Sequence, residues 1–264
     1  MQITHETRAL VMGANGGLGQ AITEAFVQRG ARVAVSGRRA DALEPVRARW
    51  NTEVVLADLL SRTDVERLAL AAREFDVLVL NAALPASGPI HDFPPDDIDR
   101  ALEVNLRAPI HIASTASRAM VERGYGQIVF ISSIAGKVAS HCTAIYSATK
   151  FGLRGFAQGL RADLREHGVG VTTVFPGFIR DAGMFADTGT VLPFGAGTRS
   201  PQDVAQAVLR AVEHNPAELD VAAFEQRLGG WLGNLFPDFV AAVQRAAGGN
   251  AVATRISAGQ RHKR

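Results

Sequence analysis

The feature of this sequence that most constrains its fold is a regular alternation of short apolar runs with segments whose apolar residues recur at helical spacing. The runs that predict strands cover residues 8–14, 31–37, 52–58, 75–83, 126–132, 169–178 and 217–223. Parallel strands joined by helical crossovers form a sheet that helices cover on both faces. The pattern therefore predicts an α/β fold, a doubly wound (Rossmann) parallel sheet of about seven strands.

The chain is long enough to form one large domain. Its 264 residues are 47% hydrophobic, so a single core can be buried without a second domain. We expect one Rossmann-type domain over residues 1–247, with an apolar lid at about 181–199 and a helical segment at about 224–247. Residues 248–264 predict a disordered basic tail.

Composition argues against several classes of protein. The formal net charge is +2, from 28 basic and 26 acidic residues, which speaks against a nucleic-acid-binding surface. No run of about 18 apolar residues occurs, so no membrane span is expected. Cys142 is the only cysteine, so an internal disulfide is impossible and a cytoplasmic location is expected. The seven histidines include no pair at helical metal-binding spacing, and no metal site is expected.

A glycine-rich turn follows the first predicted strand and leads into a predicted helix at residues 20–30. Glycines allow a tight turn and bring the backbone close to a pyrophosphate at the helix N-terminus, where free N–H groups favour negative charge. The alternative is an ordinary glycine-rich connection. The residues predicted to bind a dinucleotide here are Gly13, Asn15, Gly17, Leu18 and Gly19.

The end of the second predicted strand indicates which dinucleotide is bound. Arg38 and Arg39 stand where an NAD-binding protein usually places an acidic residue for the ribose 2′-hydroxyl. Guanidinium groups form paired, charge-assisted hydrogen bonds with a 2′-phosphate. We therefore predict that NADP(H) is preferred over NAD(H). The alternative is that both arginines merely begin a solvated helix.

Other predicted strands also end in residues suited to a cofactor crevice. Asp58 and Leu59 follow the third strand and Asn81 ends the fourth, although Asp58 and Asn81 are equally good helix caps or turn formers. The sixth strand leads into three further candidates, Pro176, Gly177 and Ile179.

Tyr146 and Lys150 lie four residues apart in a segment of helical periodicity, so both side chains project from one face. A nearby cation favours the phenolate, which predicts a tyrosine able to transfer a proton near neutral pH. The hydroxyl of Ser133, at the end of the fifth strand, is placed to hydrogen-bond the same reacting oxygen. Taken alone, a tyrosine and a lysine at this spacing are more often a solvated pair.

Seven features of the sequence resemble, in order and spacing, those of the short-chain dehydrogenase/reductase family. The resemblance covers residues 7 to about 222. It rests on Gly13-x-x-x-Gly17-x-Gly19, Asp58, Asn81-Ala82-Ala83, Asn105, Ser133, Tyr146-x-x-x-Lys150 and Pro176-Gly177.

The resemblance implies a role for each matching residue. Tyr146 would give a proton to the substrate oxygen, Lys150 would lower the pKa of Tyr146 and hold the nicotinamide ribose, and Ser133 would orient the carbonyl. Asn105, inside a long predicted helix, would seat a water in a proton relay to Lys150, although a buried and satisfied amide is the alternative. Asp58 would meet the adenine amino group, and Arg38 matches the position that marks NADP preference.

The sequence departs from the family pattern at three positions. Met12 stands where the family usually has threonine, and Ala83 where it usually has glycine. Asp181 occupies a position at which a threonine commonly binds the carboxamide or phosphate. A carboxylate there would repel a pyrophosphate unless Arg180 or another cation intervenes.

The primary hypothesis is an NADP(H)-dependent oxidoreductase that interconverts a ketone or aldehyde and an alcohol on a mainly apolar small molecule. One alternative is a catalytically silent NADP(H)-binding regulatory protein on the same fold. Another is an epimerase or dehydratase, for which the C-terminal portion leaves little room. The family's pairing of long helices, here around residues 95–122 and 143–167, predicts a homodimer or homotetramer.

Overall fold

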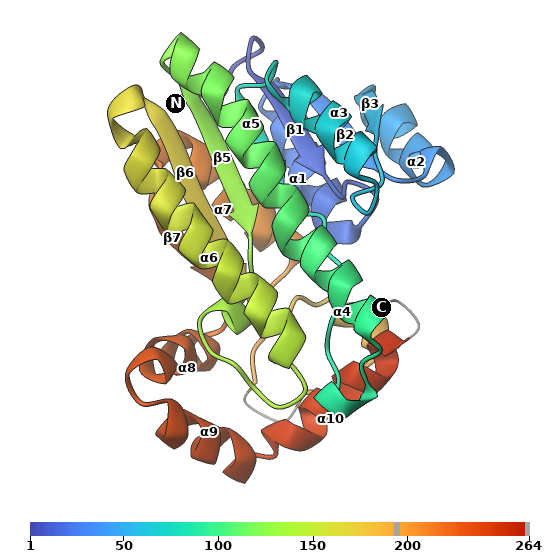
Figure 1. Ribbon diagram of the computed structural model, residues 1–264, viewed down its shortest axis with the longest axis vertical. Helices are drawn as coiled ribbons and strands as arrows, with labels where there is room; N and C mark the ends of the chain where they lie inside the picture. The colour runs from blue at the N-terminus through green and yellow to red at the C-terminus, as the bar shows by residue number, and fades with distance from the viewer. Residues whose placement is uncertain (193–195, 262–264) are drawn as a thin grey trace.

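The computed structural model describes residues 1–192 and 196–261 of the chain. Within them, seven parallel strands form one sheet in the order β3-β2-β1-β4-β5-β6-β7 (Figure 1). The strands are β1 Arg8–Met12, β2 Arg32–Gly37, β3 Glu53–Leu56, β4 Val77–Leu80, β5 Gly126–Ile131, β6 Val169–Pro176 and β7 Glu218–Val221. Each lies inside an apolar run of the sequence, so the predicted doubly wound sheet is confirmed.

Helices cover both faces of this sheet. The major helices of the body are α1 Gly17–Gln28, α2 Ala40–Trp50, α3 Arg62–Ala72, α5 Ala108–Arg123, α6 Ala144–Leu164 and α7 Pro201–His214. One buried cluster joins the sheet to α1, α2 and α7, and its large members include Phe26 and Leu43. A second joins the other face to α3, α5 and α6 through Leu68, Ile112 and Leu153. The core therefore has two halves, separated by a sheet that is buried on both sides.

The order of strands creates a crevice between β1 and β4. Strand β1 pairs with β2 on one side and with β4 on the other, so the chain reverses its direction of winding at this point. Open α/β sheets bind ligands at such a switch point, beyond the carboxyl ends of the strands. The fold thus directs attention to the loops after β1, β4, β5 and β6.

The long helix predicted around Asn105 is interrupted. Helix α4 spans Pro95–Leu102, a π-helical turn spans Glu103–Arg107, and α5 follows. Pro109 has no N–H, so it cannot donate the hydrogen bond that the carbonyl of Asn105 would accept in a continuous α-helix. The proline accounts for the change of helical pitch at the position of Asn105.

The C-terminal part forms three helices, α8 Phe224–Leu235, α9 Pro237–Ala246 and α10 Gly249–Gln260. They lie at the lower end of Figure 1, beyond the carboxyl ends of β5 and β6. The predicted helical segment at 224–247 therefore corresponds to α8 and α9. The base of the predicted lid is tied by an isolated bridge between Ile179 and Arg199, and a 3-10 turn spans Ala186–Thr188. Residues 193–195 of the predicted lid are outside the described residues.

The prediction of a disordered tail from residue 248 is wrong for α10. Ser257 Oγ donates a hydrogen bond to the carbonyl of Ser87 at 3.1 Å, and Gln260 Nε2 donates one to the carbonyl of Met184 at 3.1 Å. Small residues allow close packing, since a Cβ at Gly259 would lie 2.8 Å from the Cβ of Thr188. This helix is held by close backbone approach and polar bonds rather than by large apolar side chains, which is why composition did not reveal it. Residues 262–264 of the predicted tail lie outside the described part.

Candidate active site

The loops at the carboxyl ends of the strands enclose a mainly apolar cavity of about 650 Å³. Side chains from β4, β5, β6 and α6 meet at its inner end, and α8, α9 and α10 line its outer part. Eight of the residues singled out from the sequence line it, namely Leu18, Asn81, Ser133, Tyr146, Lys150, Pro176, Gly177 and Ile179. The cavity therefore unites residues that are up to about 160 positions apart in the sequence.

Tyr146 and Lys150 lie one turn apart on α6, as predicted. The Nζ atom of Lys150 lies 5.6 Å from the centre of the Tyr146 ring and donates a hydrogen bond of 3.0 Å to the carbonyl of Ile131. Burial lowers the pKa of Lys150 to about 8. Lys150 is therefore mostly charged at neutral pH and is anchored to the end of β5.

The expectation that Lys150 lowers the pKa of Tyr146 is not met in this structure. Burial raises the pKa of Tyr146 to about 12, and a hydrogen bond with Ser133 offsets only part of this effect. Loss of water around the phenol is the larger of these two effects. Tyr146 is therefore a protonated phenol at neutral pH.

Ser133 is held in place between two strand ends. It follows β5 and caps the short 3-10 turn Ile134–Gly136, where its Oγ accepts a hydrogen bond from the N–H of Ala135 at 3.2 Å. The same hydroxyl lies 3.4 Å from the carbonyl of Pro176 at the end of β6. These contacts, with the bond to Tyr146, orient the hydroxyl toward the cavity.

The side chain of Asn105 is buried and fully occupied. Its Oδ1 accepts a hydrogen bond from the N–H of Leu84 at 2.7 Å, and its Nδ2 donates one to the carbonyl of Leu84 at 2.9 Å. The amide therefore fastens the π-helical turn to the segment after β4. Asn105 is absent from the lining of the cavity.

The glycine-rich turn depends on bare backbone at two positions. Gly13 has a φ of 69°, and a Cβ there would lie 2.8 Å from the Cα of Ala82. A Cβ on Gly19 would lie 2.3 Å from the carbonyl oxygen of Gly13. Asn81 fixes the same turn, since its Nδ2 donates to the carbonyls of Met12 and Gly13 at 3.1 and 3.2 Å. The segment that follows β4 thus packs directly against this turn.

The other predicted cofactor residues surround the crevice in different ways. The carbonyl of Asn15 accepts a hydrogen bond from Gln20 at 3.0 Å, and Gly17 begins α1. Asp58 acts as a turn former, because its Oδ1 accepts from the N–H of Leu60 at 3.0 Å, and Leu59 packs against the core. These contacts agree with the turn-forming alternative for Asp58.

Arg38 and Arg39 are exposed beyond the end of β2. Arg39 is the N-cap residue of α2 and lies 3.8 Å from the carboxylate of Asp41. A single exposed ion pair at this distance holds an arginine only weakly. Arg38 and Arg39 therefore have the freedom to reach a phosphate at the β2 edge of the crevice.

The carboxylate of Asp181 lies beside the guanidinium of Arg180. Its carboxylate Oδ2 lies 3.3 Å from Nε of Arg180, and its φ of 70° is left-handed. The next residue, Ala182, lies over the glycine-rich turn, because a Cβ on Gly17 would be 2.2 Å from the Cβ of Ala182. The acid is thus paired with a cation beside the turn.

The outer wall of the cavity was not identified from the sequence. It includes Leu228 and Leu232 of α8, Phe239 and Val240 of α9, and Ile256 of α10. The apolar periodicity of 224–247 indicated helices, but it contains no signal that these helices close over Tyr146. Such contacts arise between distant segments and leave no local pattern.

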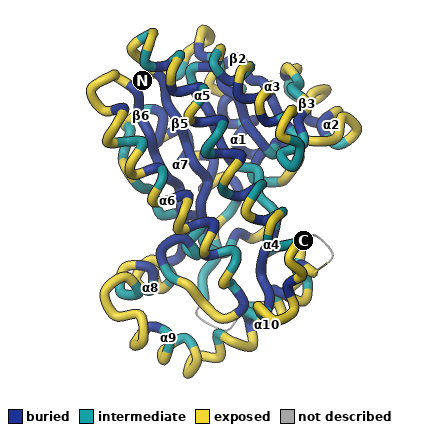
Figure 2. The backbone as a smooth tube through the Cα atoms, viewed as in Figure 1, coloured by how far each residue is buried: buried dark blue, intermediate teal, exposed yellow. Residues whose placement is uncertain are grey.

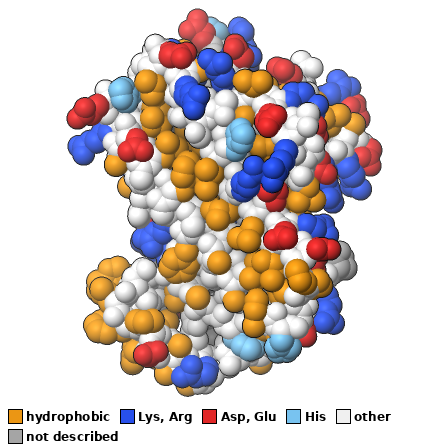
Figure 3. Space-filling view, in the orientation of Figure 1, with side chains coloured by type: hydrophobic (Ala, Val, Ile, Leu, Met, Phe, Trp, Pro, Cys, Tyr) orange, Lys and Arg blue, Asp and Glu red, His pale blue; other side chains and the backbone are white. Residues whose placement is uncertain are grey.

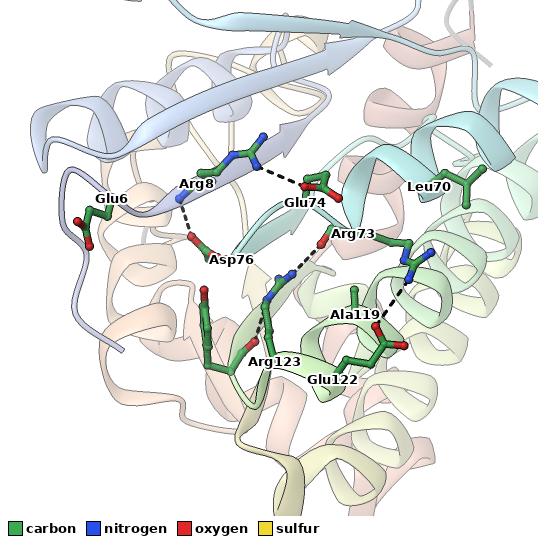
Figure 4. Close-up of a pocket in the computed structure, with 10 residues that line it drawn as sticks. Glu6, Arg8, Leu70, Arg73, Glu74, Asp76, Ala119, Glu122 and Arg123 are labelled. Atoms are coloured by element: carbon green, nitrogen blue, oxygen red, sulfur yellow. Dashed lines mark hydrogen bonds and ion pairs between the residues drawn. The ribbon is translucent and has the colours of Figure 1, made fainter.

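A second hollow, at the opposite end of the sheet, lacks comparable chemistry (Figure 4). Arg8 begins β1, and its backbone N–H donates to Asp76 at 2.8 Å while its guanidinium lies 3.7 Å from Glu74. Arg73 pairs with Glu122 at 3.7 Å. The charged side chains of this hollow are thus engaged with one another, at the amino ends of the strands rather than the carboxyl ends.

Among residues 1–192 and 196–261, no group of three or more metal-ligating side chains is close enough to hold a metal ion. None of the helices in the same residues combines the length and the apolar character needed to cross a membrane.

Comparison with known proteins identifies the family. The family pattern described as short chain dehydrogenase matches residues 7–191. An uncharacterized oxidoreductase of Staphylococcus aureus strain MRSA252 is 32% identical over 219 residues, which cover 80% of this chain and 93% of that protein. The chain belongs to the short-chain dehydrogenase family. Members of this family are oxidoreductases that bind NAD(P) nucleotides.

Solved structures agree with this assignment. A short-chain dehydrogenase from Streptomyces avermitilis is 27% identical, with a TM-score of 0.74, and the match covers 91% of this chain and 95% of that one. The fold is also that of a short-chain dehydrogenase from Sphingobium yanoikuyae in complex with NADPH, at 24% identity and a TM-score of 0.77 over 88% and 96% of the two chains.

Proposed function

We propose that this short-chain dehydrogenase uses NADP(H) to interconvert a ketone or aldehyde and the corresponding alcohol on a mainly apolar small molecule. The observation that carries the proposal is that Ser133 and Tyr146 line the inner end of one apolar cavity, with Lys150 one helical turn from Tyr146. A carbonyl oxygen placed there would meet two hydroxyl donors and a nearby cation.

The glycine-rich turn fits a dinucleotide. Helix α1 begins at Gly17, and its N-terminus, where every residue is described, has neither a side-chain cap nor an acidic residue in its first turn. Its N–H groups therefore remain for an anion, and the helix dipole favours a pyrophosphate there. When bound, the nicotinamide supplies a hydride to the carbonyl carbon, or accepts one in the reverse reaction.

The chain's own residues would handle the proton. In reduction, Tyr146 would give its phenolic proton to the carbonyl oxygen, and the phenol carries this proton at neutral pH. Ser133 donates a hydrogen bond to the same oxygen. Lys150 then stabilises the phenolate that remains. Because Pro109 cannot donate to the carbonyl of Asn105, we assign to that carbonyl the water that would return a proton through Lys150.

The phenol can be tested because the chain has only two tyrosines. Tyr146→Phe should lower kcat for NADPH-dependent reduction of apolar ketones by roughly 10²- to 10⁴-fold, with little change in NADPH affinity. Tyr125→Phe is the matched control, because Tyr125 is half-exposed at the far end of the sheet. Equal turnover by all three proteins would disprove the role of Tyr146. Tight NADPH binding by the wild type without turnover of any carbonyl would identify a nucleotide-binding regulator instead.

The proposed preference for NADP(H) rests on the exposed arginines after β2 and has its own test. Arg38→Glu should reduce kcat/KM for NADPH by roughly tenfold or more while that for NADH holds or rises, because a carboxylate repels the 2′-phosphate and accepts from the ribose hydroxyl. Arg49→Glu, on the exposed part of α2, controls for a general change of charge. An unchanged ratio of the two constants would show that Arg38 does not select the cofactor.

We also propose that the protein is a homodimer or homotetramer that pairs through α5 and α6. Phe151 on α6 is 38% exposed, as expected for part of a contact surface. Sedimentation at micromolar concentration should show a species larger than the monomer, and Phe151→Glu should shift it toward the monomer. A monomer for the unaltered chain would contradict this.

A further inference from the structure

Two stripes of large apolar side chains on α8 and α9 are exposed. Those of α8 recur at intervals of four, three and four residues, and those of α9 at intervals of three and four, so each stripe occupies one face of its helix. Their exposed fractions range from 42% to 73%. We call these seven side chains the C-terminal apolar face: Phe224, Leu228, Trp231, Leu235, Phe236, Phe239 and Val243.

The face lies at the end of the molecule that is beyond the carboxyl ends of the strands. Hydrophobic side chains gather over α8 at the lower left of Figure 3, and the same helices carry exposed backbone in Figure 2. A patch that contains one Trp and three Phe side chains is unusual on the surface of a protein that meets only water, and such patches mark a site of contact.

This face is continuous with the cavity that contains Tyr146. Leu228, Phe239 and Val243 belong to the face and also line the cavity. Whatever covers the C-terminal apolar face therefore lies at the outer end of the cavity. An apolar compound could pass from that surface to Tyr146 along a path lined by apolar side chains.

The net charge of residues 224–264 indicates what kind of surface covers the C-terminal apolar face. Residues 224–264 contain six basic and two acidic residues, a net charge of +4, whereas the whole chain carries +2 and the remainder is therefore −2. Arg227, Arg245 and Arg255 are exposed on α8, α9 and α10. Both acidic residues, Glu225 and Asp238, lie on α8 and α9 together with Arg227 and Arg245, so the excess of +4 comes from Arg255, Arg261, Lys263 and Arg264 further along the chain.

We propose that α8 and α9 lie on the surface of an anionic lipid bilayer and that the cavity takes its apolar carbonyl substrate from that bilayer. Amphipathic helices with aromatic residues on one face and arginines beside them bind in the plane of such an interface without crossing it. The substrate part of the proposal rests on the proposed function, whereas the docking part does not.

Docking can be measured without cofactor or carbonyl, so its failure is distinct from failure of the proposed function. The chain has two tryptophans, and Trp50→Phe leaves Trp231 as the only one. In this variant, vesicles of phosphatidylcholine with phosphatidylglycerol should shift Trp231 emission to the blue, and lipids brominated on their chains should quench it. Vesicles of phosphatidylcholine alone should bind more weakly, and added salt should weaken binding to the anionic vesicles.

A pair of substitutions tests the face itself. Trp231 and Leu235 are exposed and do not line the cavity. Trp231→Ser with Leu235→Ser should weaken flotation with anionic vesicles by roughly tenfold or more, since two large side chains no longer leave water. Leu70→Ser with Tyr125→Ser removes equally exposed apolar side chains at the far end and should leave flotation unchanged. Absence of wild-type flotation, or equal flotation of all variants, overturns the proposal.

Two readouts separate the remaining outcomes. If the serine pair turns a dimer into a monomer in sedimentation while the wild type ignores vesicles, the face is a contact between copies and the proposal is wrong. With a long-chain ketone dissolved in anionic vesicles, the serine pair should reduce it several-fold more slowly than the wild type, whereas a water-soluble ketone is reduced equally by both. Equal rates on both ketones would remove the substrate part.

Discussion

The sheet body and the C-terminal helices differ in how they hold their residues. In the body, polar side chains beside the cavity are fixed by short bonds to buried backbone, as Lys150 is to Ile131 and Asn105 is to Leu84. In α8 and α9 the side chains toward the cavity are mainly apolar, and many are half-exposed. We therefore expect the body to fix the geometry of the reaction and the C-terminal helices to select the substrate.

A group of charges in the body lies beside α8, at the place where the two regions meet. Lys137, just after the turn that carries Ser133, has its Nζ 2.5 Å from Asp220 Oδ1 and 2.9 Å from Glu218 Oε2 of β7. Arg154 of α6 lies 2.7 Å from the same glutamate. Helix α8 rests on this turn, since a Cβ on Gly230 would be 3.5 Å from the Cβ of Lys137. The turn that Ser133 caps is therefore followed directly by a residue that packs against α8, a helix of the outer wall of the cavity.

The largest effect is expected from breaking this junction. Lys137→Met should lower the free energy of unfolding at neutral pH by roughly 2–4 kcal/mol, because it leaves two largely buried carboxylates without one of their cations. Burial alone would raise the pKa of Glu218, but hydrogen bonds from Arg154 and Lys137 hold it below its usual value. The stabilisation that Glu218 adds is therefore present above its unfolded pKa and is lost as pH falls, so the deficit of the variant should shrink in acid.

Urea unfolding across a range of pH would measure this effect. Arg47→Met, which removes one partner of an exposed i,i+3 pair on α2, is the control and should leave the midpoint unchanged. If Lys137→Met matched that control, the charge group would be solvated in practice and the two regions would be independent of each other.

The next effect concerns the buried ammonium of the body. The pKa of Lys150 is about 8 in the folded chain, against an ordinary value of 10.5. Between these values the unfolded chain binds a proton that the folded chain does not, so Lys150 makes stability rise with pH over this interval. Lys150→Met should be more stable than the wild type at pH 7, by an amount on the order of 2 kcal/mol, and the gap should close toward pH 10.

Denaturant midpoints of both proteins at a series of pH values up to about 10 would show this convergence. The upper limit matters, because Tyr146, with its pKa raised to about 12, keeps its proton when folded and makes stability fall above its ordinary value of 10.0. Parallel pH profiles for the two proteins would mean that Lys150 has a normal pKa and is not desolvated by the body.

The same contrast explains what the sequence could reveal. Parallel strands that are buried on both faces, such as β5 and β6, consist mainly of apolar residues, so the sheet could be predicted from the sequence. Gly13 and Gly19 could also be identified from the sequence, because no other side chain fits at either position. Tyr146 and Lys150 could be paired in advance since both belong to one helix.

Features that depend on distant contacts could not be derived from local pattern. The direction of the Tyr146 pKa shift follows from burial by several elements, which the spacing to Lys150 does not contain. Helix α10 consists of small and polar residues that resemble a disordered tail until Ser87 and Met184 supply their partners. Pro109 is visible in the sequence, but the π-helical turn that its missing N–H produces at Asn105 was not predicted.

The smallest effect should arise at the outer wall and should appear as a change in preference rather than a loss. Leu232 of α8 lines the cavity but belongs to neither the charge group nor the catalytic residues. Leu232→Trp should lower kcat/KM for a bulky apolar ketone by roughly tenfold, because the added ring takes space that the substrate needs, and should leave a small ketone nearly unaffected. Leu70→Trp, exposed on α3, is the control for an added indole. Equal losses on both ketones would show that α8 acts on the geometry of the reaction after all, and the division between a body that reacts and helices that select would not hold.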